Sequence, residues 1–351
     1  MNQARRAGHP TADPEWTRVS HRLARRRRRM RSRLVIVTAT AVAAAAIVAT
    51  VVRFASPSPA APLAGTALPT STASYLGVYE SGPPQTFQPV TEFARTVGRA
   101  PNLVGYYSGW KEPFQTSFAQ AVHAHGAVTV VQIDPTDFLV SKIAAGYYDS
   151  YLRSYADSVR RFGQPVVIGF GHEMNAPWYT WGYGQTPAAT FVAAWRHMVA
   201  LFRDQGAHNV TWLWTLQADE PGTAPAIAPW WPGSQYVTWV GIDGYYYRPS
   251  DTFSSVFGKT ITQVRILTGK PLLLSETAIG PQAGQSAKIG DLFNGMREYG
   301  TLGLMWFDIA QNDGIYHQDW HIEDNPTAAS AFRHRASSLK LAPVGRAGSR
   351  Q

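Results

Sequence analysis

Two glutamates stand out because each follows a short apolar run. Glu173 lies in GFGHEMNAPWYTWG (residues 169–182) after the run PVVIGF, and Glu276 lies in KPLLLSETAIG (residues 270–280) after PLLLS. Short apolar runs bounded by proline and glycine are typical of buried strands, so both carboxylates are predicted at strand ends. Such a pair can divide proton donation and charge stabilisation between its members.

This division of labour is what the cleavage of an acetal between two sugars requires. One carboxyl group protonates the departing oxygen, and the other attacks or stabilises the anomeric carbon as positive charge builds on the ring. The two glutamates are 103 positions apart. Only a fold that gathers distant strand ends can place them roughly 5 to 5.5 Å apart, as a retaining mechanism needs.

Eight short β-rich runs alternate with segments of helical spacing, and this alternation predicts a (β/α)₈ TIM barrel. Two segments, 187–205 and 286–299, show apolar residues at helical spacing. Glu173 follows the fourth predicted strand and Glu276 the seventh, at the carboxyl ends where such barrels carry reactive groups. The predicted strands cover residues 75–79, 103–107, 128–133, 166–170, 210–214, 239–243, 272–274 and 302–307.

The motifs at the strand ends together resemble glycoside hydrolase family 26, a family of β-mannanases and some β-1,3-1,4-glucanases. The resemblance covers nearly all of residues 75–338. It implies that Glu173 is the acid/base and Glu276 the nucleophile. The matching motifs are His172-Glu173 trailed by two tryptophans and a glycine, VGIDGY at 240–245, Ser275-Glu276, and MWFD at 305–308.

The same resemblance implies further substrate contacts. His172 would bind substrate near the scissile bond, Tyr245 would touch the nucleophile, and Trp306 would lie under the reacting sugar. Tyr245, Tyr246 and Tyr247 are consecutive. A shift of one residue would turn the ring to the other face of the strand, so the tyrosine that faces the nucleophile stays open. For His172, a hydrogen-bonded core position is the alternative.

Aromatic residues follow several predicted strands. Trp110, Trp178 and Trp181 are predicted to stack on sugar faces, although tryptophans also fill cores. Trp195 and Trp212 are assigned to packing, because one lies within a helical segment and the other within a strand.

No metal or cofactor is expected. His317, Asp319 and His321 alternate in a loop and could ligate a metal, but a retaining glycosidase needs none and a sugar-binding loop explains them equally well. The absence of cysteine excludes thiol nucleophiles and disulfides.

The net charge of +9 is concentrated near the N-terminus. Residues 1–33 contain eleven arginines against Asp13 and Glu15, and Arg53 adds one charge, which leaves residues 54–351 near −1 by subtraction. A nearly neutral catalytic region suits a neutral β-linked polysaccharide and argues against nucleic acid as a partner.

The N-terminal region is predicted to hold the chain at a membrane. The Arg-rich tail (1–33) would stay in the cytoplasm, and the uncharged segment 34–52 would span about 28 Å as a helix. A Pro/Ala/Ser/Thr linker (53–74) would follow, then the hydrolase domain (75–338) and a disordered tail (339–351). Secretion after signal cleavage is the alternative.

The sequence therefore predicts a membrane-tethered, outward-facing, retaining endo-β-glycoside hydrolase, monomeric, with β-mannan as its first candidate substrate. A mixed-linkage β-1,3-1,4-glucanase of the same fold is one alternative. The other is a catalytically idle barrel that binds a glycan in a membrane polysaccharide-assembly system, because a fold alone does not fix a function.

Overall fold

The computed structural model describes residues 67–220, 222–280, 284–310 and 318–344. Eight parallel strands close into a barrel in chain order, with β1 pairing to both β2 and β8. The predicted barrel is confirmed. The strands are β1 (Tyr75–Glu80), β2 (Leu103–Gly109), β3 (Val128–Asp134), β4 (Val166–Phe170), β5 (Val210–Gln217), β6 (Trp239–Asp243), β7 (Leu272–Thr277) and β8 (Gly303–Asp308).

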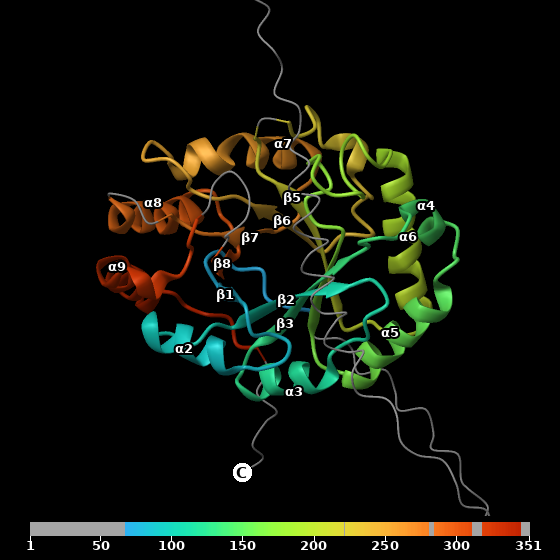
Figure 1. Cartoon of the computed structure of the whole chain (residues 1–351), viewed down its shortest axis with the longest axis horizontal. Helices are drawn as coiled ribbons and strands as arrows, with labels where there is room; N and C mark the ends of the chain where they lie inside the picture. Colours follow the sequence, from blue (N-terminus) through green and yellow to red (C-terminus); the bar gives the residue numbers. More distant parts are fainter. Residues whose placement is uncertain (1–66, 221, 281–283, 311–317, 345–351) are drawn as a thin grey trace, which may run out of the picture.

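Helices form a ring around the barrel (Figure 1). Both helical segments predicted from apolar spacing are present, as α6 and α8. The helices are α2 (Gln88–Thr96), α3 (Thr116–Ala124), α4 (Val140–Ala144), α5 (Asp149–Phe162), α6 (Ala188–Asp204), α7 (Lys259–Leu267), α8 (Gln285–Glu298) and α9 (Pro326–Ser337). Shorter helical turns are η1 (Ala228–Trp230), η2 (Ser254–Gly258) and η3 (Ile322–Asp324).

The alternation of side chains along each strand builds two apolar layers. On β3, Val131 and Ile133 belong to the layer between barrel and helices, whereas Val128 and Val130 belong to the barrel interior. The next inward position on β3 is the buried Gln132. The interior therefore changes from apolar to polar toward the carboxyl ends of the strands, where the two glutamates lie.

Two predicted boundaries are wrong, because short flanking segments pack against the barrel. Leu68, in the predicted linker, and Val344, in the predicted tail, both join the interior apolar layer. The backbone N–H of Ala342 donates to Ser74 O at 2.9 Å. These segments cover apolar interior side chains at the amino ends of the strands, a role that their composition does not reveal.

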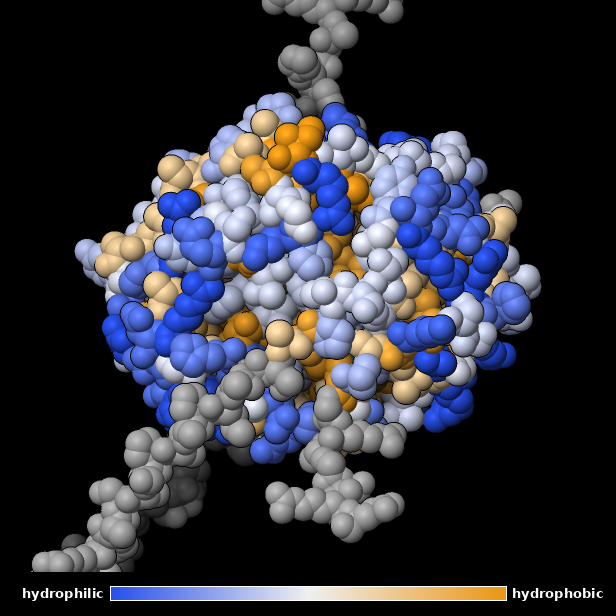
Figure 2. Space-filling view, turned by 180° about the vertical axis from the view of Figure 1, so that it is seen from behind, coloured by the Kyte–Doolittle hydropathy of each residue, from blue (hydrophilic) through white to orange (hydrophobic). Residues whose placement is uncertain are grey.

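Hydrophilic residues cover most of the face seen in Figure 2, and hydrophobic residues form smaller patches among them. Within the described ranges, no helix has both the length and the apolar character needed to cross a membrane. The predicted span 34–52 lies outside those ranges, as do the Arg-rich tail and residues 53–66 of the linker.

Candidate active site

The structure brings Glu173 and Glu276 together although they are far apart in sequence. Both side chains are buried, at 6% and 5% exposure, at the carboxyl ends of β4 and β7. One carboxylate oxygen of Glu173 lies within 4.8 Å of one of Glu276. This separation fits the roughly 5 to 5.5 Å of retaining glycosidases better than the roughly 6.5 to 9.5 Å of inverting ones.

An unusual backbone turn positions Glu173. Its φ is +54°, in the left-handed region that non-glycine residues rarely adopt, and its N–H donates to Thr215 O on β5 at 3.0 Å. Such backbone strain is found at functional sites held by their surroundings. Trp178, half-buried in the following loop, donates from Nε1 to Glu173 Oε2 at 2.6 Å.

Two tyrosine hydroxyls hold Glu276. Tyr245 donates to Oε2 at 2.7 Å, and Tyr107 donates to Oε1. The next residue, Tyr246, turns away and donates to Asp291 on α8 at 2.9 Å. The structure therefore selects Tyr245 from the three consecutive tyrosines. Sequence reasoning missed Tyr107, whose only signal is its place near the carboxyl end of β2.

His172 is fixed at both ring nitrogens. Nδ1 lies 2.9 Å from Asp134 Oδ1 at the end of β3, and Nε2 lies 3.2 Å from the Tyr179 hydroxyl. Burial lowers the pKa of His172, but Asp134 and the two glutamates raise it to about 10, so the ring is cationic at neutral pH. Asp134 had no predicted site role. The structure shows that Asp134 and Tyr179 are the partners of the His172 ring.

Trp181 supports this arrangement from below the surface. It is 2% exposed, donates from Nε1 to His172 O at 2.8 Å, and stacks on Tyr179 with ring centroids 4.3 Å apart. Its ring is therefore not free to stack on a sugar, and the prediction that Trp181 contacts substrate is wrong. Trp181 instead supports His172 and Tyr179.

Unequal surroundings tune the two glutamates. Burial raises the pKa of Glu173, His172 lowers it, and the Glu276 carboxylate raises it again, to about 8 overall. Burial also raises the pKa of Glu276, while His172 and the hydroxyls of Tyr107 and Tyr245 lower it. Glu276 thus receives two hydroxyl donors that favour its ionised form, whereas Glu173 can hold a proton at neutral pH.

The predicted sugar platform Trp306 lies on the wrong side of its strand. It is 0% exposed, its ring meets Phe332 of α9 edge-on at 5.2 Å, and Nε1 donates to Trp320 O at 3.1 Å. The neighbouring Phe307 is partly exposed, and its ring lies 5.8 Å from that of Tyr245. Alternation along β8 therefore turns Phe307, not Trp306, toward the site.

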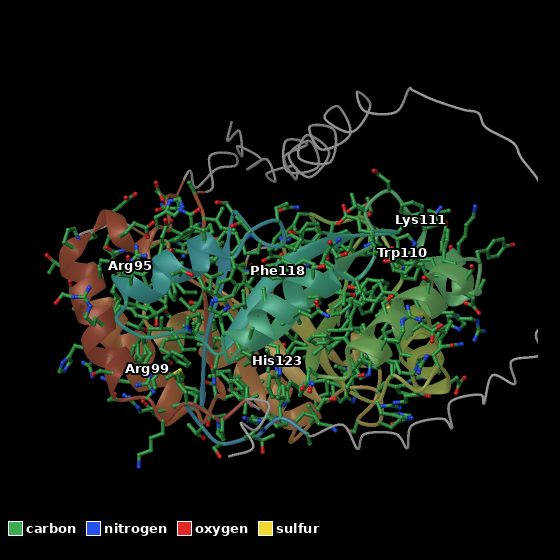
Figure 3. All side chains as sticks on the ribbon, turned by 90° about the horizontal axis from the view of Figure 1, so that it is seen from below. Arg95, Arg99, Trp110, Lys111, Phe118 and His123 are labelled. Atoms are coloured by element: carbon green, nitrogen blue, oxygen red, sulfur yellow. The ribbon has the colours of Figure 1, made fainter. Side chains whose placement is uncertain are left out.

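Trp110, which is labelled in Figure 3, is likewise a packing residue. It is 6% exposed, and its ring lies 5.1 Å from Tyr151 of α5 and 5.8 Å from Phe170 of β4. The prediction that it stacks on substrate is therefore wrong. Trp195 and Trp212 do pack against each other, at 6.3 Å, as predicted.

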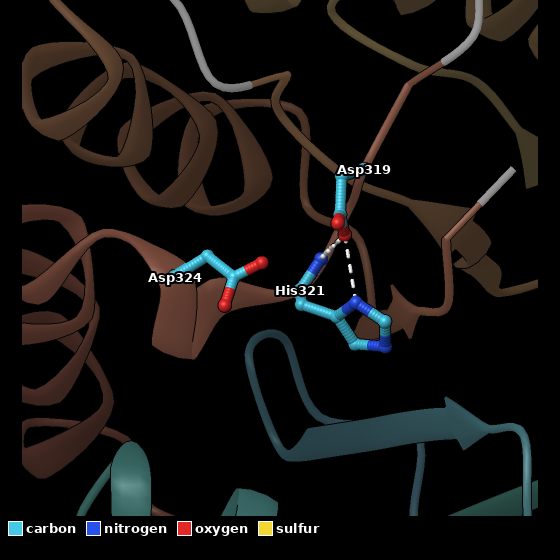
Figure 4. Close-up of side chains that lie close together, drawn as sticks. All are labelled: Asp319, His321 and Asp324. Carbon is cyan, nitrogen blue, oxygen red and sulfur yellow. Dashed lines mark hydrogen bonds and ion pairs between the residues drawn. The ribbon is translucent and has the colours of Figure 1, made fainter. Parts of the chain in front are cut away.

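The loop considered as a metal site brings Asp319, His321 and Asp324 close together (Figure 4). His321 Nδ1 lies 2.7 Å from Asp319 Oδ1, and the His321 backbone N–H donates to the same oxygen at 3.1 Å. These contacts explain the pair as a local turn. His317 lies outside the described residues.

Solved structures with a similar fold include two bacterial proteins. The β-mannanase of family GH26 from Bacteroides ovatus superposes with a TM-score of 0.59 at 15% identity, over 80% of this chain and 92% of that one. The YdhT protein from Bacillus subtilis superposes with a TM-score of 0.59 at 18% identity, over 79% and 88%. At these identities the likeness shows the fold alone.

Curated relatives match over part of their length. Endoglucanase H of Acetivibrio thermocellus is 27% identical over 260 residues, covering 70% of this chain and 28% of that protein. Beta-1,3-xylanase TXYA of Vibrio sp is 26% identical over 151 residues, covering 43% and 31%. Mannan endo-1,4-beta-mannosidase A and B of Caldalkalibacillus mannanilyticus is 28% identical over 100 residues, covering 26% and 19%. The chain thus spans less than a third of the length of each of these relatives.

The sequence model described as glycosyl hydrolase family 26 matches residues 127–340, which is more than half of the chain and includes both glutamates. The chain therefore belongs to glycosyl hydrolase family 26, a family of O-glycoside hydrolases.

Proposed function

We propose that this protein is an endo-acting, retaining β-glycoside hydrolase of a neutral polysaccharide. The observation that carries the proposal is the buried pair Glu173 and Glu276, with oxygens within 4.8 Å and different hydrogen-bond partners. Family membership supports the reaction class.

The proposed reaction takes two steps. Glu173 donates its proton to the glycosidic oxygen as Glu276 attacks the anomeric carbon, so the leaving sugar departs as an alcohol and a glycosyl ester forms on Glu276. Glu173, now ionised, takes a proton from water, and the hydroxide oxygen displaces Glu276. The pKa of Glu173, at about 8, suits a group that must first give and then accept a proton near neutral pH.

The surrounding residues have supporting roles in this proposal. Tyr245 and Tyr107 orient Glu276 and stabilise its charge, and His172, held by Asp134, supplies a cation beside the pair. Trp178 holds Glu173 and, being half-buried, offers a ring surface to the sugar on the leaving-group side.

β-Mannan is the proposed substrate. A curated mannosidase relative and similarity to the fold of a solved β-mannanase support it. The relatives named endoglucanase H and beta-1,3-xylanase favour two further candidates, a β-glucan and a β-1,3-xylan.

The test is hydrolysis of β-1,4-mannan, mixed-linkage β-glucan and β-1,3-xylan by the full chain and by Glu173→Gln and Glu276→Gln. We expect cleavage of one polymer into internal fragments, and a fall of roughly 10² to 10⁴-fold or more in each variant. The matched control is Glu298→Gln, on the exposed face of α8, which should leave the rate unchanged. Binding of a polymer without cleavage by the unaltered chain would contradict the enzyme and support a glycan-binding barrel.

We further propose that the chain acts as a monomer held at the outside of a cell membrane by residues 34–52. Their lack of charge and the eleven arginines before them support this placement. Release by signal cleavage is the competing outcome.

A further inference from the structure

Asp243 is a third carboxyl group beside Glu173 and Glu276, and the reaction proposed above does not use it. It ends β6 and stands opposite Glu276 in the register with β7. Its side chain is 0% exposed, and one of its oxygens lies within 4.8 Å of an oxygen of each glutamate. At such separations its protonation state must affect how readily the glutamates ionise.

The hydrogen bonds of Asp243 are unequal at its two oxygens. Ser275 Oγ donates to Oδ1 at 2.5 Å, whereas Oδ2 is buried and has no hydrogen-bond partner among the described residues. The ion pairs of the described residues do not include Asp243. An ionised carboxylate in this position would be buried with a single donor, which is far more unfavourable than burial of the neutral acid.

The groups that face Asp243 also disfavour its ionisation. Burial raises its pKa well above the usual range, Glu276 and Glu173 raise it further, and His172 and the Ser275 hydroxyl lower it. His172 is already paired with Asp134. The titratable groups around Asp243 are Glu276 of β7, Glu173 and His172 after β4, Tyr79 of β1, Tyr179 of the loop before α6, and Tyr245 after β6.

We propose that Asp243 is a positioning residue that keeps its proton throughout the reaction and directs an Oδ2–H donor toward Glu276. Oδ1 already accepts from Ser275, so the proton belongs on the oxygen that has no partner. A neutral donor here stabilises the ionised nucleophile, whereas a second carboxylate would oppose its ionisation. The inference rests on the proposed function, because it assigns Asp243 a role in keeping Glu276 ionised.

Carboxyl ¹³C NMR of the full chain tests the proton directly and without any substrate. The protein is labelled at its Asp and Glu carboxyl carbons, and Asp243→Asn and Glu276→Gln assign the two signals. We expect the Asp243 signal to stay at the position of a protonated acid across neutral pH. Titration of Asp243 below about pH 6, well under the raised pKa that its burial predicts, would overturn the proposal.

Two replacements show whether Asp243 acts on Glu276 as a neutral hydrogen-bond donor or as a negative charge. Asp243→Asn keeps an acceptor for Ser275 and a donor at the second position, so the Glu276 titration midpoint should stay within a few tenths of a unit. Asp243→Leu has similar size but no donor, so the midpoint should rise by about one unit. A fall of the midpoint in Asp243→Asn would mean that a negative charge had been removed, and would overturn the proposal.

The kinetic arm repeats this comparison on whichever polymer the chain cleaves. The acid limb of kcat/KM should be unchanged in Asp243→Asn and should move to higher pH in Asp243→Leu, with a fall of about tenfold or more at the lower pH. Asp204→Asn, at an exposed position of α6, is the control. If the unaltered chain cleaves nothing, the proposed function fails, while the NMR titrations still decide the state of Asp243 and its effect on Glu276.

Discussion

At the scale of single residues, Glu173 and Glu276 show how surroundings separate two identical side chains. Glu276 accepts from Tyr107 and Tyr245, so its ionised form is stabilised by hydroxyl donors. Glu173 has one indole donor, from Trp178, and sits in a strained left-handed turn. The same burial therefore leaves one group suited to attack and the other suited to hold a proton.

The buried Glu173 should make stability depend on pH. Its pKa is raised from 4.5 in the unfolded chain to about 8, so its contribution is fully present below about pH 4.5 and is lost as pH rises through about 8. Glu173→Gln cannot ionise and escapes this loss. We expect the variant to unfold at a higher temperature than the unaltered chain. The difference between the two in free energy of unfolding should grow from about pH 5 to about pH 9 and reach the order of 1 to 4 kcal/mol.

Thermal unfolding followed by circular dichroism at several pH values measures this margin. Glu298→Gln is the control, since an exposed glutamate should show no such trend. A difference between Glu173→Gln and the unaltered chain that stays constant with pH would show that Glu173 ionises normally in the folded state.

The two glutamates were predictable from the sequence, but several of their partners were not. Each glutamate follows an apolar run that predicts a buried strand, so its place at the barrel rim follows from the topology. Tyr107 lies near the end of the second strand and Asp134 ends the third, and nothing local marks them as contacts of residues more than 35 positions away. Their roles depend on which strands become neighbours of the site.

At the scale of elements, strand periodicity decides which side chains enter the site. The sequence located all eight strands, yet it did not determine the face of each residue at a strand end. On β8 a single step separates the buried Trp306 from Phe307, whose ring lies beside that of Tyr245. On β6 and the residues after it, the same one-step alternation separates Tyr245 from Tyr246. Coordinates were needed because apolar runs buried on both sides carry no alternation signal.

Glycines inside the barrel leave room for the aromatic side chains of the site. A Cβ at Gly105 of β2 would overlap the ring of Tyr79, which is buried and stacks on Tyr107 at 4.9 Å. We therefore expect Gly105→Ala to lower the free energy of unfolding by about 1 to 3 kcal/mol through overpacking. Activity should fall as well, because displacement of Tyr107 removes a donor from Glu276.

Urea unfolding measures the change, with comparison of m-values to check that the denatured state is unaffected. Gly269→Ala is the matched control, because a Cβ there has no neighbour within 4 Å and its φ is not left-handed. We expect that control to change stability by no more than about 0.5 kcal/mol. Equal losses of unfolding free energy in the two variants would show that the side chains around Gly105 can move to accommodate the added methyl group.

At the scale of the whole molecule, charge and catalysis are separated along the chain. The excess of positive charge lies before residue 54, and the remaining sequence is close to neutral overall. The barrel domain is also larger than its strands and helices suggest, since Leu68 and Val344 join the interior layer. Composition could not predict this extension, because a proline- and alanine-rich segment becomes part of a core only when the barrel offers apolar side chains to cover.

The separation of charge leads to the last prediction, that residues 34–52 hold the chain at a membrane. A full chain expressed in bacterial cells should sediment with membranes, resist an alkaline wash and dissolve in detergent, because nineteen uncharged residues match the hydrocarbon thickness. A variant without residues 34–52 should remain soluble and unfold at the same temperature, since the described barrel begins beyond them. The arginines before the span favour a cytoplasmic N-terminus and a barrel that faces outward. Protease added outside intact cells should therefore digest the barrel. A shortened chain free in the medium would instead identify the segment as a cleaved signal.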